Sequence, residues 1–274
     1  MPKTISIYTE NNDYQKFEVL KRNRTKRHQY GEFFVEGVRN INEAINNDWE
    51  INSFIYSKSK ELSNWGKAVL AASRATVHYE LHGDLMGKLS DKEETSELIA
   101  IVSMPEDDPS RIRIQDPMLV VVFDRPSNRG NLGTIIRSCD ALGVQGLILT
   151  GHAVDLYDPE TVRASMGSLF HLPTLRMPSP TAVQQWVRHL QETIPDLQIV
   201  GTSARGSKEL YYADFAKPTI LLIGNETDGL CHKYQEMSTT SVKIPIGGAA
   251  SSLNVACAAS ILLYEISRQQ QLGY

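Results

Sequence analysis

The second half of the chain alternates short apolar runs with longer segments of helical spacing. The run over 118–123 (MLVVVF) is continuously apolar, which is typical of a strand buried on both faces, and 219–224 (TILLIG) is a further predicted strand. The same pattern predicts further strands over 146–150, 197–202 and 242–246, and helices over 131–142, 159–170 and 181–193. Helices alternating with such strands predict a parallel sheet covered on both sides. Ligands of these sheets bind beyond the carboxyl ends of the strands.

The first half has a weaker but similar pattern. A polar, basic segment reaches to about residue 30 and contains a predicted helix over 14–23. Strands are predicted over 32–37, 51–56, 75–79 and 98–102, and helices over 38–47, 64–73 and 82–89. The segment 104–116 carries two prolines and mixed charge, as linkers do. We therefore expect a small α/β domain over 1–106, a linker over 107–116 and a second α/β domain over 117–274.

The segment 242–268 (VKIPIGGAASSLNVACAASILLYEISR) passes from a strand through two glycines into a helix. Between about 253 and 266, apolar residues fall on every face of that helix, which is typical of a buried helix. A chain of 274 residues does not easily bury one helix so fully, so we expect a partner subunit. Ser252 and Asn254 would lie at the helix N-terminus, where free backbone N–H groups favour ligand binding.

Composition and charge exclude several classes of protein. Apolar and charged contents are those of an ordinary globular chain, and no apolar run is long enough to cross a membrane. The three cysteines form no disulfide framework, and the first residues have no signal-peptide core, so we expect a cytoplasmic protein. The seven histidines show no metal-ligand spacing, so no metal site is expected.

The net charge of −4 does not indicate a nucleic-acid-binding protein, but the charge distribution is uneven. Six Lys and Arg residues lie between 16 and 27, against one acid. Such a run is either a solvated surface or a contact for phosphate. The candidates for RNA contact are Lys21, Arg22, Arg24, Lys26 and Arg27.

Three loops at predicted strand ends carry polar residues with candidate chemistry. The first contains neither G-x-G-x-x-G nor a P-loop, and its Asn128 precedes a helix that carries Arg137. Arg137 is either a solvated residue or a ligand for a phosphate or a reacting oxygen. The second loop spans 224–230 (GNETDGL), and the third contains Ser252 and Asn254. Each loop alone is a weak signal, because Asn, Ser and Gly are common in turns and helix caps.

Taken together, the three loops resemble the signature motifs of the SpoU/TrmH branch of the SPOUT RNA methyltransferases. The resembling patterns are N-x-G-x-x-G-x-x-x-R over 128–137, G-N-E-x-x-G-L over 224–230, and I-P-I followed by S-S-L-N-V-A over 244–256. The segment 163–170 (RASMGSLF) is similar to the connecting helix of that family, and the resemblance covers about 116–270. The N-terminal segment resembles the RNA-binding domain of many members, a fold similar to small ribosomal kink-turn-binding proteins.

The resemblance implies transfer of a methyl group from S-adenosylmethionine to a ribose 2′-hydroxyl of RNA. It also implies a deep trefoil knot in the C-terminal domain and a homodimer paired there. The cofactor would be held by backbone groups of Thr202, Gly224, Ile244, Ile246 and Leu253. The reacting groups would be positioned by Arg137, Asn128, Glu226, Ser252 and Asn254, with Arg137 from the opposite subunit.

The sequence leaves the proton acceptor and the RNA open. Arginine keeps its proton in proteins, so we expect Arg137 to bind phosphate or the developing alkoxide, with the proton leaving through phosphate, Ser252 or water. The separate N-terminal domain favours 23S rRNA over tRNA. Two rival functions are an RNA-binding protein without catalysis and a nucleotide-dependent α/β enzyme. The intact polar motif residues argue against the first, and the missing Gly-rich fingerprints argue against the second.

Overall fold

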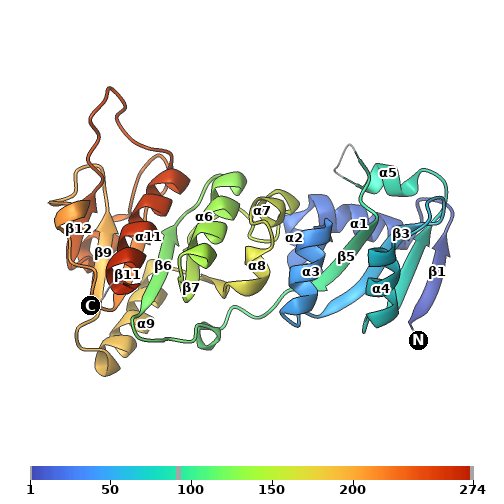
Figure 1. Cartoon of the computed structure of the whole chain (residues 1–274), viewed down its shortest axis with the longest axis horizontal. Helices are drawn as coiled ribbons and strands as arrows, with labels where there is room; N and C mark the ends of the chain where they lie inside the picture. Colours follow the sequence, from blue (N-terminus) through green and yellow to red (C-terminus); the bar gives the residue numbers. More distant parts are fainter. Residues whose placement is uncertain (1, 91–93, 272–274) are drawn as a thin grey trace. The chain divides into compact units, whose positions relative to one another are not determined.

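The computed structural model describes residues 2–90 and 94–271, which pack as two compact units. The first unit comprises residues 1–105 together with 155–170, and the second comprises 106–154 together with 171–274. The segment 155–170 follows the second predicted strand of the C-terminal half, yet it packs with the N-terminal residues. Figure 1 shows the elements of both units along the chain.

The first unit is built on a five-stranded mixed sheet of order β1-β4-β3-β5-β2. Parallel pairs join β1 to β4 and β4 to β3, whereas β5 runs antiparallel to β3 and β2. The strands are β1 (Lys3–Ile7), β2 (Glu32–Glu36), β3 (Ile51–Ser57), β4 (Val77–Leu81) and β5 (Leu98–Ser103). The helices are α1 (Asn12–Arg22), α2 (Arg24–Tyr30), α3 (Val38–Asn46), α4 (Asn64–Ala72), α5 (Leu85–Leu89), α7 (Pro159–Ala164) and α8 (Ser168–His171).

The second unit is built on a seven-stranded parallel sheet of order β10-β12-β9-β11-β6-β7-β8. The strands are β6 (Leu119–Asp124), β7 (Gly146–Thr150), β8 (Thr174–Met177), β9 (Gln198–Thr202), β10 (Lys208–Glu209), β11 (Thr219–Ile223) and β12 (Thr240–Lys243). The helices are α6 (Arg129–Ala141), α9 (Pro180–Thr193), α10 (His232–Met237) and α11 (Val255–Gln271), with short 3-10 turns at Pro109–Arg111 and Leu210–Tyr212. The predicted parallel α/β domain is thus confirmed.

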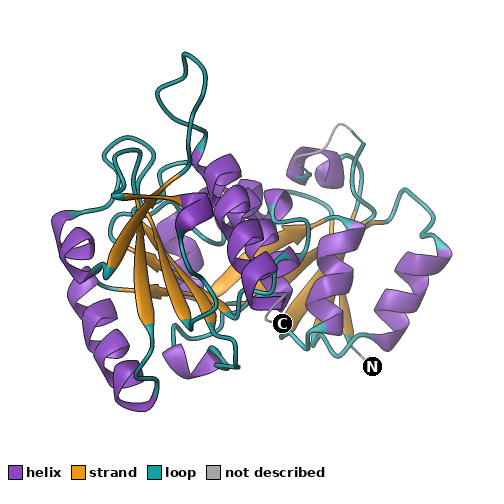
Figure 2. Cartoon of the chain, turned by 60° about the vertical axis from the view of Figure 1, so that its left-hand side comes forward, coloured by secondary structure: helices purple, strands orange, loops and turns teal. Residues whose placement is uncertain are grey.

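Helices cover both faces of the parallel sheet, as its continuously apolar strands require. Val183 and Val187 of α9 and Tyr234 of α10 share a core with alternate residues of the sheet such as Val120 and Leu222. Helix α11 packs along α6, where the hydroxyls of Ser138 and Ser260 are 2.8 Å apart. Figure 2 shows the sheet between these two helical layers. The arrangement brings the carboxyl ends of β6, β11 and β12 to one edge, from which the three motif loops start.

Several predicted elements differ from the observed ones. The N-terminal segment contains β1 and α2 in addition to the predicted helix, and β8, β10 and α10 were not predicted. The single helix predicted over 159–170 is two helices, because Met166 and Gly167 both adopt positive φ angles of 53° and 96° between them. A left-handed pair cannot continue an α-helix, so the chain turns sharply there.

Candidate active site

One cavity lies beside the carboxyl ends of β9, β11 and β12 and is lined by three segments far apart in sequence. These are residues 202–204, 223–229 and parts of 242–262. Its walls include every residue of the predicted cofactor set, namely Thr202, Gly224, Ile244, Ile246 and Leu253. Glu226 and Ser252 of the predicted catalytic set line it too. The fold therefore brings the second and third motifs to one place.

The turn after β11 has the shape that its glycines allow. The backbone groups of Asn225 and Gly229 exchange hydrogen bonds of 3.1 and 3.0 Å, and Gly229 has a φ of 69°. A side chain at Gly224 would place its Cβ 2.4 Å from the carbonyl carbon of Gly229, so only glycine fits there. The turn holds Glu226 at the rim of the cavity.

Glu226 connects this turn to the first motif. Its carboxylate accepts hydrogen bonds from the Ser127 hydroxyl at 2.7 Å, from the Ser127 N–H at 3.1 Å and from the Asn128 N–H at 3.3 Å. The Asn131 amide adds a fourth bond at 3.4 Å. Burial alone would raise the pKa of Glu226, but these hydrogen bonds outweigh it and lower the pKa below its ordinary value. The group is therefore ionised at neutral pH and is a weak proton acceptor, suited to holding the loops together.

Asn128 and Asn254 both cap helices at the site. The Asn128 side chain accepts from the Asn131 N–H at 2.9 Å and starts α6. Asn254 accepts from the Ala256 N–H at 2.8 Å at the start of α11, and its amide donates to the Asn131 side chain at 3.1 Å. Asn131 thus contacts Glu226 and Asn254, which belong to two different motifs. Sequence reasoning missed Asn131, although its place in the N-R-G-N loop, in the first turn of a motif helix, was a usable signal.

Arg137 does not join the cavity in the same chain. Its side chain is exposed on α6, and its guanidinium forms no hydrogen bond or ion pair with any residue in 2–90 or 94–271. The first motif therefore separates into Asn128, which lies beside the turn of Glu226, and Arg137, which faces solvent in the single chain.

Helix α11 buries only one face within the chain. Ala259, Leu263 and Ile266 are buried, whereas Ile261 and Tyr264 keep 41% and 62% of their surface exposed. Cys257 is exposed on the same side, since 257, 261 and 264 are spaced by four and three residues. One chain therefore leaves an apolar face uncovered on the helix that the sequence predicts to be buried all round.

A second polar network holds the 225–229 turn that carries Glu226. The sequence did not predict this network. The Asp124 carboxylate is buried and accepts from the Cys231 N–H at 2.9 Å and from the Arg125 guanidinium at 3.1 Å. Arg125 also donates to the Gly229 carbonyl at 3.1 Å, and its own carbonyl accepts from the Asn225 side chain at 2.7 Å. Both ends of the 225–229 turn are thus tied to Arg125.

The basic run at 16–27 is largely engaged within the first unit. Lys16 lies 2.6 Å from a carboxylate oxygen of Glu32, and Lys21 donates to the Leu89 carbonyl at 2.9 Å. Arg22 and Arg24 are exposed and Lys26 is partly exposed, so these three remain candidates for RNA contact.

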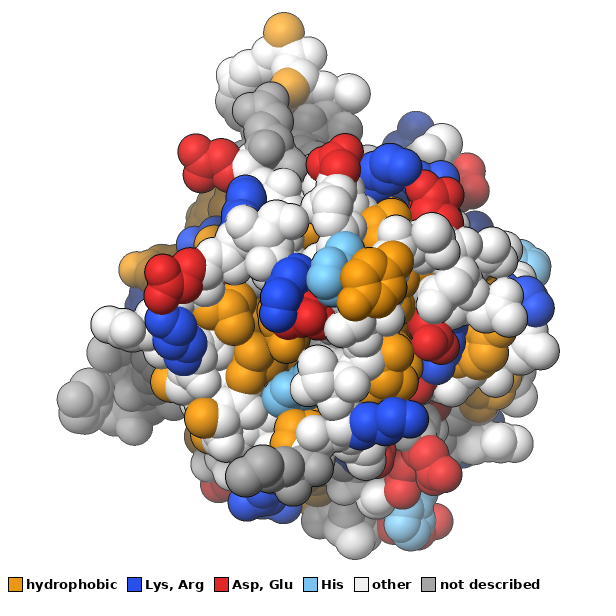
Figure 3. Space-filling view, turned by 90° about the vertical axis from the view of Figure 1, so that its right-hand side faces the viewer, with side chains coloured by type: hydrophobic (Ala, Val, Ile, Leu, Met, Phe, Trp, Pro, Cys, Tyr) orange, Lys and Arg blue, Asp and Glu red, His pale blue; other side chains and the backbone are white. Residues whose placement is uncertain are grey.

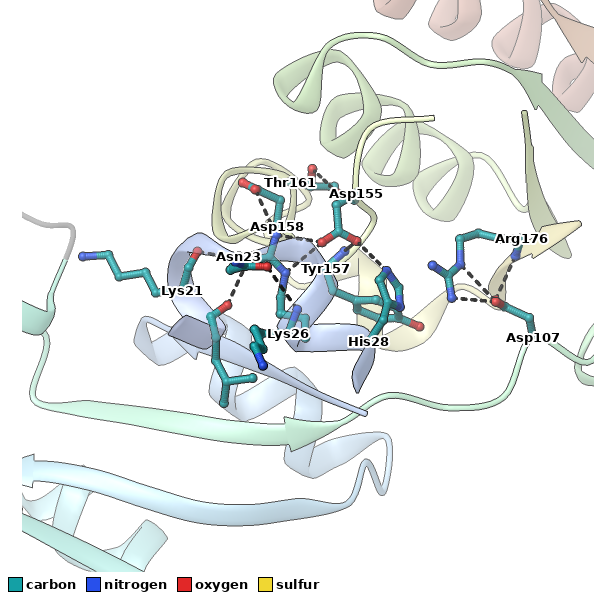
Figure 4. A network of polar contacts seen from close by, with 12 residues as sticks. Lys21, Asn23, Lys26, His28, Asp107, Asp155, Tyr157, Asp158, Thr161 and Arg176 are labelled. Carbon is teal, nitrogen blue, oxygen red and sulfur yellow. Dashed lines mark hydrogen bonds and ion pairs between the residues drawn. The ribbon is translucent and has the colours of Figure 1, made fainter. Parts of the chain in front are cut away.

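The prediction that Arg27 contacts RNA is corrected by its burial. Only 1% of its surface is exposed, and its guanidinium lies 2.7 Å from Asp155 and 3.3 Å from Asp158. It also donates to the carbonyls of Leu20 and Lys21. Figure 4 shows Asp155 and Asp158 directed toward the N-terminal helices, with the polar contacts around them. Arg27 therefore fastens the 155–170 segment within the first unit.

Residues 2–90 and 94–271 contain neither a metal-binding cluster nor a membrane-spanning helix. No group of three or more His, Cys, Asp or Glu side chains is arranged to hold a metal ion there. Within the same residues, no helix has the length and apolar content needed to cross a membrane.

Comparison with known proteins agrees with this geometry. Residues 118–264 match the SpoU rRNA Methylase family, and residues 11–100 match the SpoU L30e-like domain. The chain is 44% identical to the 23S rRNA (uridine(2479)-2'-O)-methyltransferase of Streptomyces viridochromogenes, over 99% of this chain and 95% of that protein.

Solved structures give the same result. The SpoU methyltransferase AviRb from Streptomyces viridochromogenes, solved in complex with AdoMet, superposes with a TM-score of 0.91 at 44% identity over 96% of this chain and all of that one. An AdoMet-bound rRNA methyltransferase from Sinorhizobium meliloti has a TM-score of 0.85 at 28% identity, over 98% and 99% of the two chains. The resemblance stated from the motifs is confirmed, and the chain belongs to the SpoU rRNA methylase family.

Proposed function

We propose that the chain transfers the methyl group of S-adenosylmethionine to a ribose 2′-hydroxyl of 23S rRNA. The observation that carries this proposal is the single cavity lined by the second and third motifs, with the first motif joined to it through Glu226. The 23S rRNA assignment is supported by the name of the relative in Streptomyces viridochromogenes.

The cavity suits the cofactor in its composition. Ile244, Leu253 and Leu262 offer apolar walls for a flat adenine, while the strand ends at Thr202 and Ile244 offer backbone donors and acceptors for its edge. Gly224 brings two backbone segments close together at the cavity wall. Thr202, Gly224, Ile244, Ile246 and Leu253 would hold the cofactor.

The protein would contribute to the reaction mainly by aligning the 2′-oxygen with the methyl group and by removing the proton of the 2′-hydroxyl. The bound cofactor supplies a methyl group already activated on a sulfonium. The chain must place the 2′-oxygen in line with it, and alignment of this kind lowers a barrier by about 7 to 11 kcal/mol. Ser252 lines the cavity and would contact the ribose, whereas ionised Glu226 would hold the loops together and be a poor base. The proton would leave through a substrate phosphate, Ser252 or water.

Arg137 would act from a second copy of the chain. It is exposed and free of partners among the described residues, and the uncovered face of α11 offers a surface for a second subunit. A homodimer paired through this face would cover Ile261 and Tyr264 and bring the partner's guanidinium to the ribose. We include in the proposal the family's trefoil knot around the 244–254 segment and a cytoplasmic location, where an rRNA substrate is made.

Mixed dimers test whether Arg137 of one subunit acts at the cavity of the other. Co-expressed subunits would carry either Arg137→Ala or Leu253→Trp, which fills the cavity. A mixed dimer pairs one intact cavity with the opposite subunit's intact arginine, so activity should return although each parent is inactive. If mixed dimers form and stay as inactive as the parents, Arg137 does not act across the interface.

The proposed reaction is tested by transfer of labelled methyl to unmodified 23S rRNA, 16S rRNA and bulk tRNA, with Arg137→Ala beside the wild type. We expect label on 23S rRNA and its loss in the variant. Label on tRNA alone would replace the substrate with tRNA. Cofactor binding tested in parallel separates the remaining case, because a protein that neither binds the cofactor nor transfers label would be a non-catalytic RNA-binding protein.

A further inference from the structure

The turn between α7 and α8 presents an apolar side chain at a strained position. Met166 adopts a φ of 53°, a left-handed conformation uncommon for residues other than glycine, and it is 38% exposed. Because the Met166 side chain is partly exposed, its burial does not offset the cost of the strained backbone. Strain of this kind concentrates at functional sites, so it raises the question of what Met166 contacts.

The turn is held rigidly against α3. Gly167 has a φ of 96°, and a Cβ at this position would lie 2.6 Å from Cγ of Glu43 and 3.7 Å from Cγ of Arg39. The Trp49 indole donates to the Phe170 carbonyl at 2.9 Å on one side of the turn. On the other side, Asp155 and Asp158 are fixed by Arg27. The conformation of Met166 is therefore fixed by packing on both sides.

Two unpaired arginines flank the exposed methionine. Arg163 precedes it by three residues on the last turn of α7, and Arg39 lies on α3 beside Gly167. Both side chains are exposed, and neither forms an ion pair or side-chain hydrogen bond with the residues that the structure describes. In contrast, Lys58 and Lys88 of the same unit pair with Glu80 and Glu10.

The face near β1 has a different charge pattern. Figure 3, viewed from the side where β1 lies in Figure 1, shows Lys and Arg side chains interspersed with Asp and Glu. No extended area of one charge is visible on that face. That face therefore offers a polyanion no continuous basic surface.

We propose that Arg39, Arg163 and Met166 form an RNA-binding surface, which we call the Met166 surface, on which the arginines contact phosphates and the methionine packs against a base. The inference rests on the proposed function, since it takes RNA as the substrate. Arginine binds phosphate through two parallel hydrogen bonds. Methionine is unbranched and polarisable, and proteins that deform nucleic acids insert such apolar side chains between bases.

The test is equilibrium binding of a 23S rRNA transcript over a range of salt concentrations. The variant Arg39→Ala/Arg163→Ala should bind at least tenfold more weakly at 0.1 M salt, because it loses two phosphate contacts. The slope of log K against log salt should fall by about 1.4 to 1.8, at roughly 0.7 to 0.9 per phosphate. Met166→Ala should weaken binding severalfold and leave the slope unchanged, since it carries no charge.

The matched control removes two exposed arginines of the second unit, Arg113→Ala/Arg188→Ala. If the control lowers affinity and slope as much as Arg39→Ala/Arg163→Ala does, the effect is one of bulk charge and the proposal is wrong. Wild-type affinity and slope in the surface variant would overturn it equally. Thermal unfolding and cofactor binding should match the wild type in all variants, which separates loss of RNA contact from misfolding.

The outcome is distinguishable from failure of the proposed function. If the wild type methylates 23S rRNA and the surface variants bind normally, only the Met166 surface fails. If the wild type binds the transcript through this surface but transfers no methyl group to it, the surface stands and the proposed activity fails.

Discussion

The side-chain amide of Asn254 donates a hydrogen bond of 3.1 Å to the side-chain oxygen of Asn131 and thereby joins the third motif to the first. The same Asn254 caps α11 through its oxygen, at 2.8 Å from the Ala256 nitrogen. One side chain therefore performs a stabilising and a connecting task with different atoms, and substitutions can separate the two.

Asn254→Asp keeps the capping oxygen and removes the donor to Asn131. We expect a melting temperature close to that of the wild type and a clear fall in the rate of methyl transfer. Asn254→Ala removes both contacts and should also lower the free energy of unfolding by about 1 kcal/mol through loss of the cap. Equal activity of Asn254→Asp and the wild type would show that the link to Asn131 is dispensable.

Arg27 should matter for stability rather than for RNA contact. Arg27→Met leaves the buried Asp155 carboxylate without its partner, which should cost about 3 to 5 kcal/mol. Hydrogen exchange in β2 and α7, measured together with urea unfolding, should locate the loss in the first unit. The variant Arg27→Met/Asp155→Leu also removes the unpaired carboxylate and should recover much of the lost free energy of unfolding. A stable Arg27→Met protein with weakened RNA binding would restore the surface role predicted from the sequence.

Glu226 gives a pH-dependent contribution to stability. Its folded-state pKa is lowered, so ionised Glu226 stabilises the folded chain above its ordinary pKa of 4.5, and this contribution is lost as the pH falls through the folded-state value. The difference in melting temperature between the wild type and Glu226→Gln should therefore be large at pH 7 and shrink below about pH 4.5. A difference independent of pH would mean that the ionised form gains nothing from Ser127 and Asn131.

Arg125 should fix the shape of the 225–229 turn at the cavity, although it does not itself contact the reacting groups. Arg125→Met removes the bonds to Asp124 and Gly229 and should raise KM for S-adenosylmethionine more than it lowers kcat. Arg125→Lys should recover only part of the affinity, because one ammonium cannot reach both partners as the planar guanidinium does. Arg188→Met on α9 is the matched control. An unchanged KM would assign Arg125 to stability alone.

The sequence predicted what depends on local pattern. The runs that became β6 and β11 are apolar apart from Asp124 at the end of β6 and Thr219 at the start of β11, so they could be recognised without knowledge of their neighbours. Strand β1 (KTISI) was missed because it has an exposed, polar pattern and exists through its pairing with β4, more than 70 residues away. The break at Met166 was missed because nothing in RASMGS excludes a helix; the close contact of Gly167 with α3 requires the turn.

The site residues, too, were predicted where they depend on a local sequence pattern and missed where they depend on distant contacts. The motif residues at the cavity were recognised because their spacing resembles a known family, and the structure brings them together. Arg27 was misassigned because its partners, Asp155 and Asp158, lie 128 and 131 residues away. Asn131 and Arg125 were missed because their importance lies in hydrogen bonds between loops, which no local pattern records.

The most direct test of the central claim is the chemical identity of the product. Unmodified 23S rRNA incubated with the protein and S-adenosylmethionine would be digested to nucleosides and analysed by mass spectrometry. We predict one additional methyl group on a ribose 2′-oxygen, resistant to alkaline hydrolysis at that position and absent with Arg137→Ala. A methyl group on a base, or one that Arg137→Ala leaves undiminished, would contradict the account.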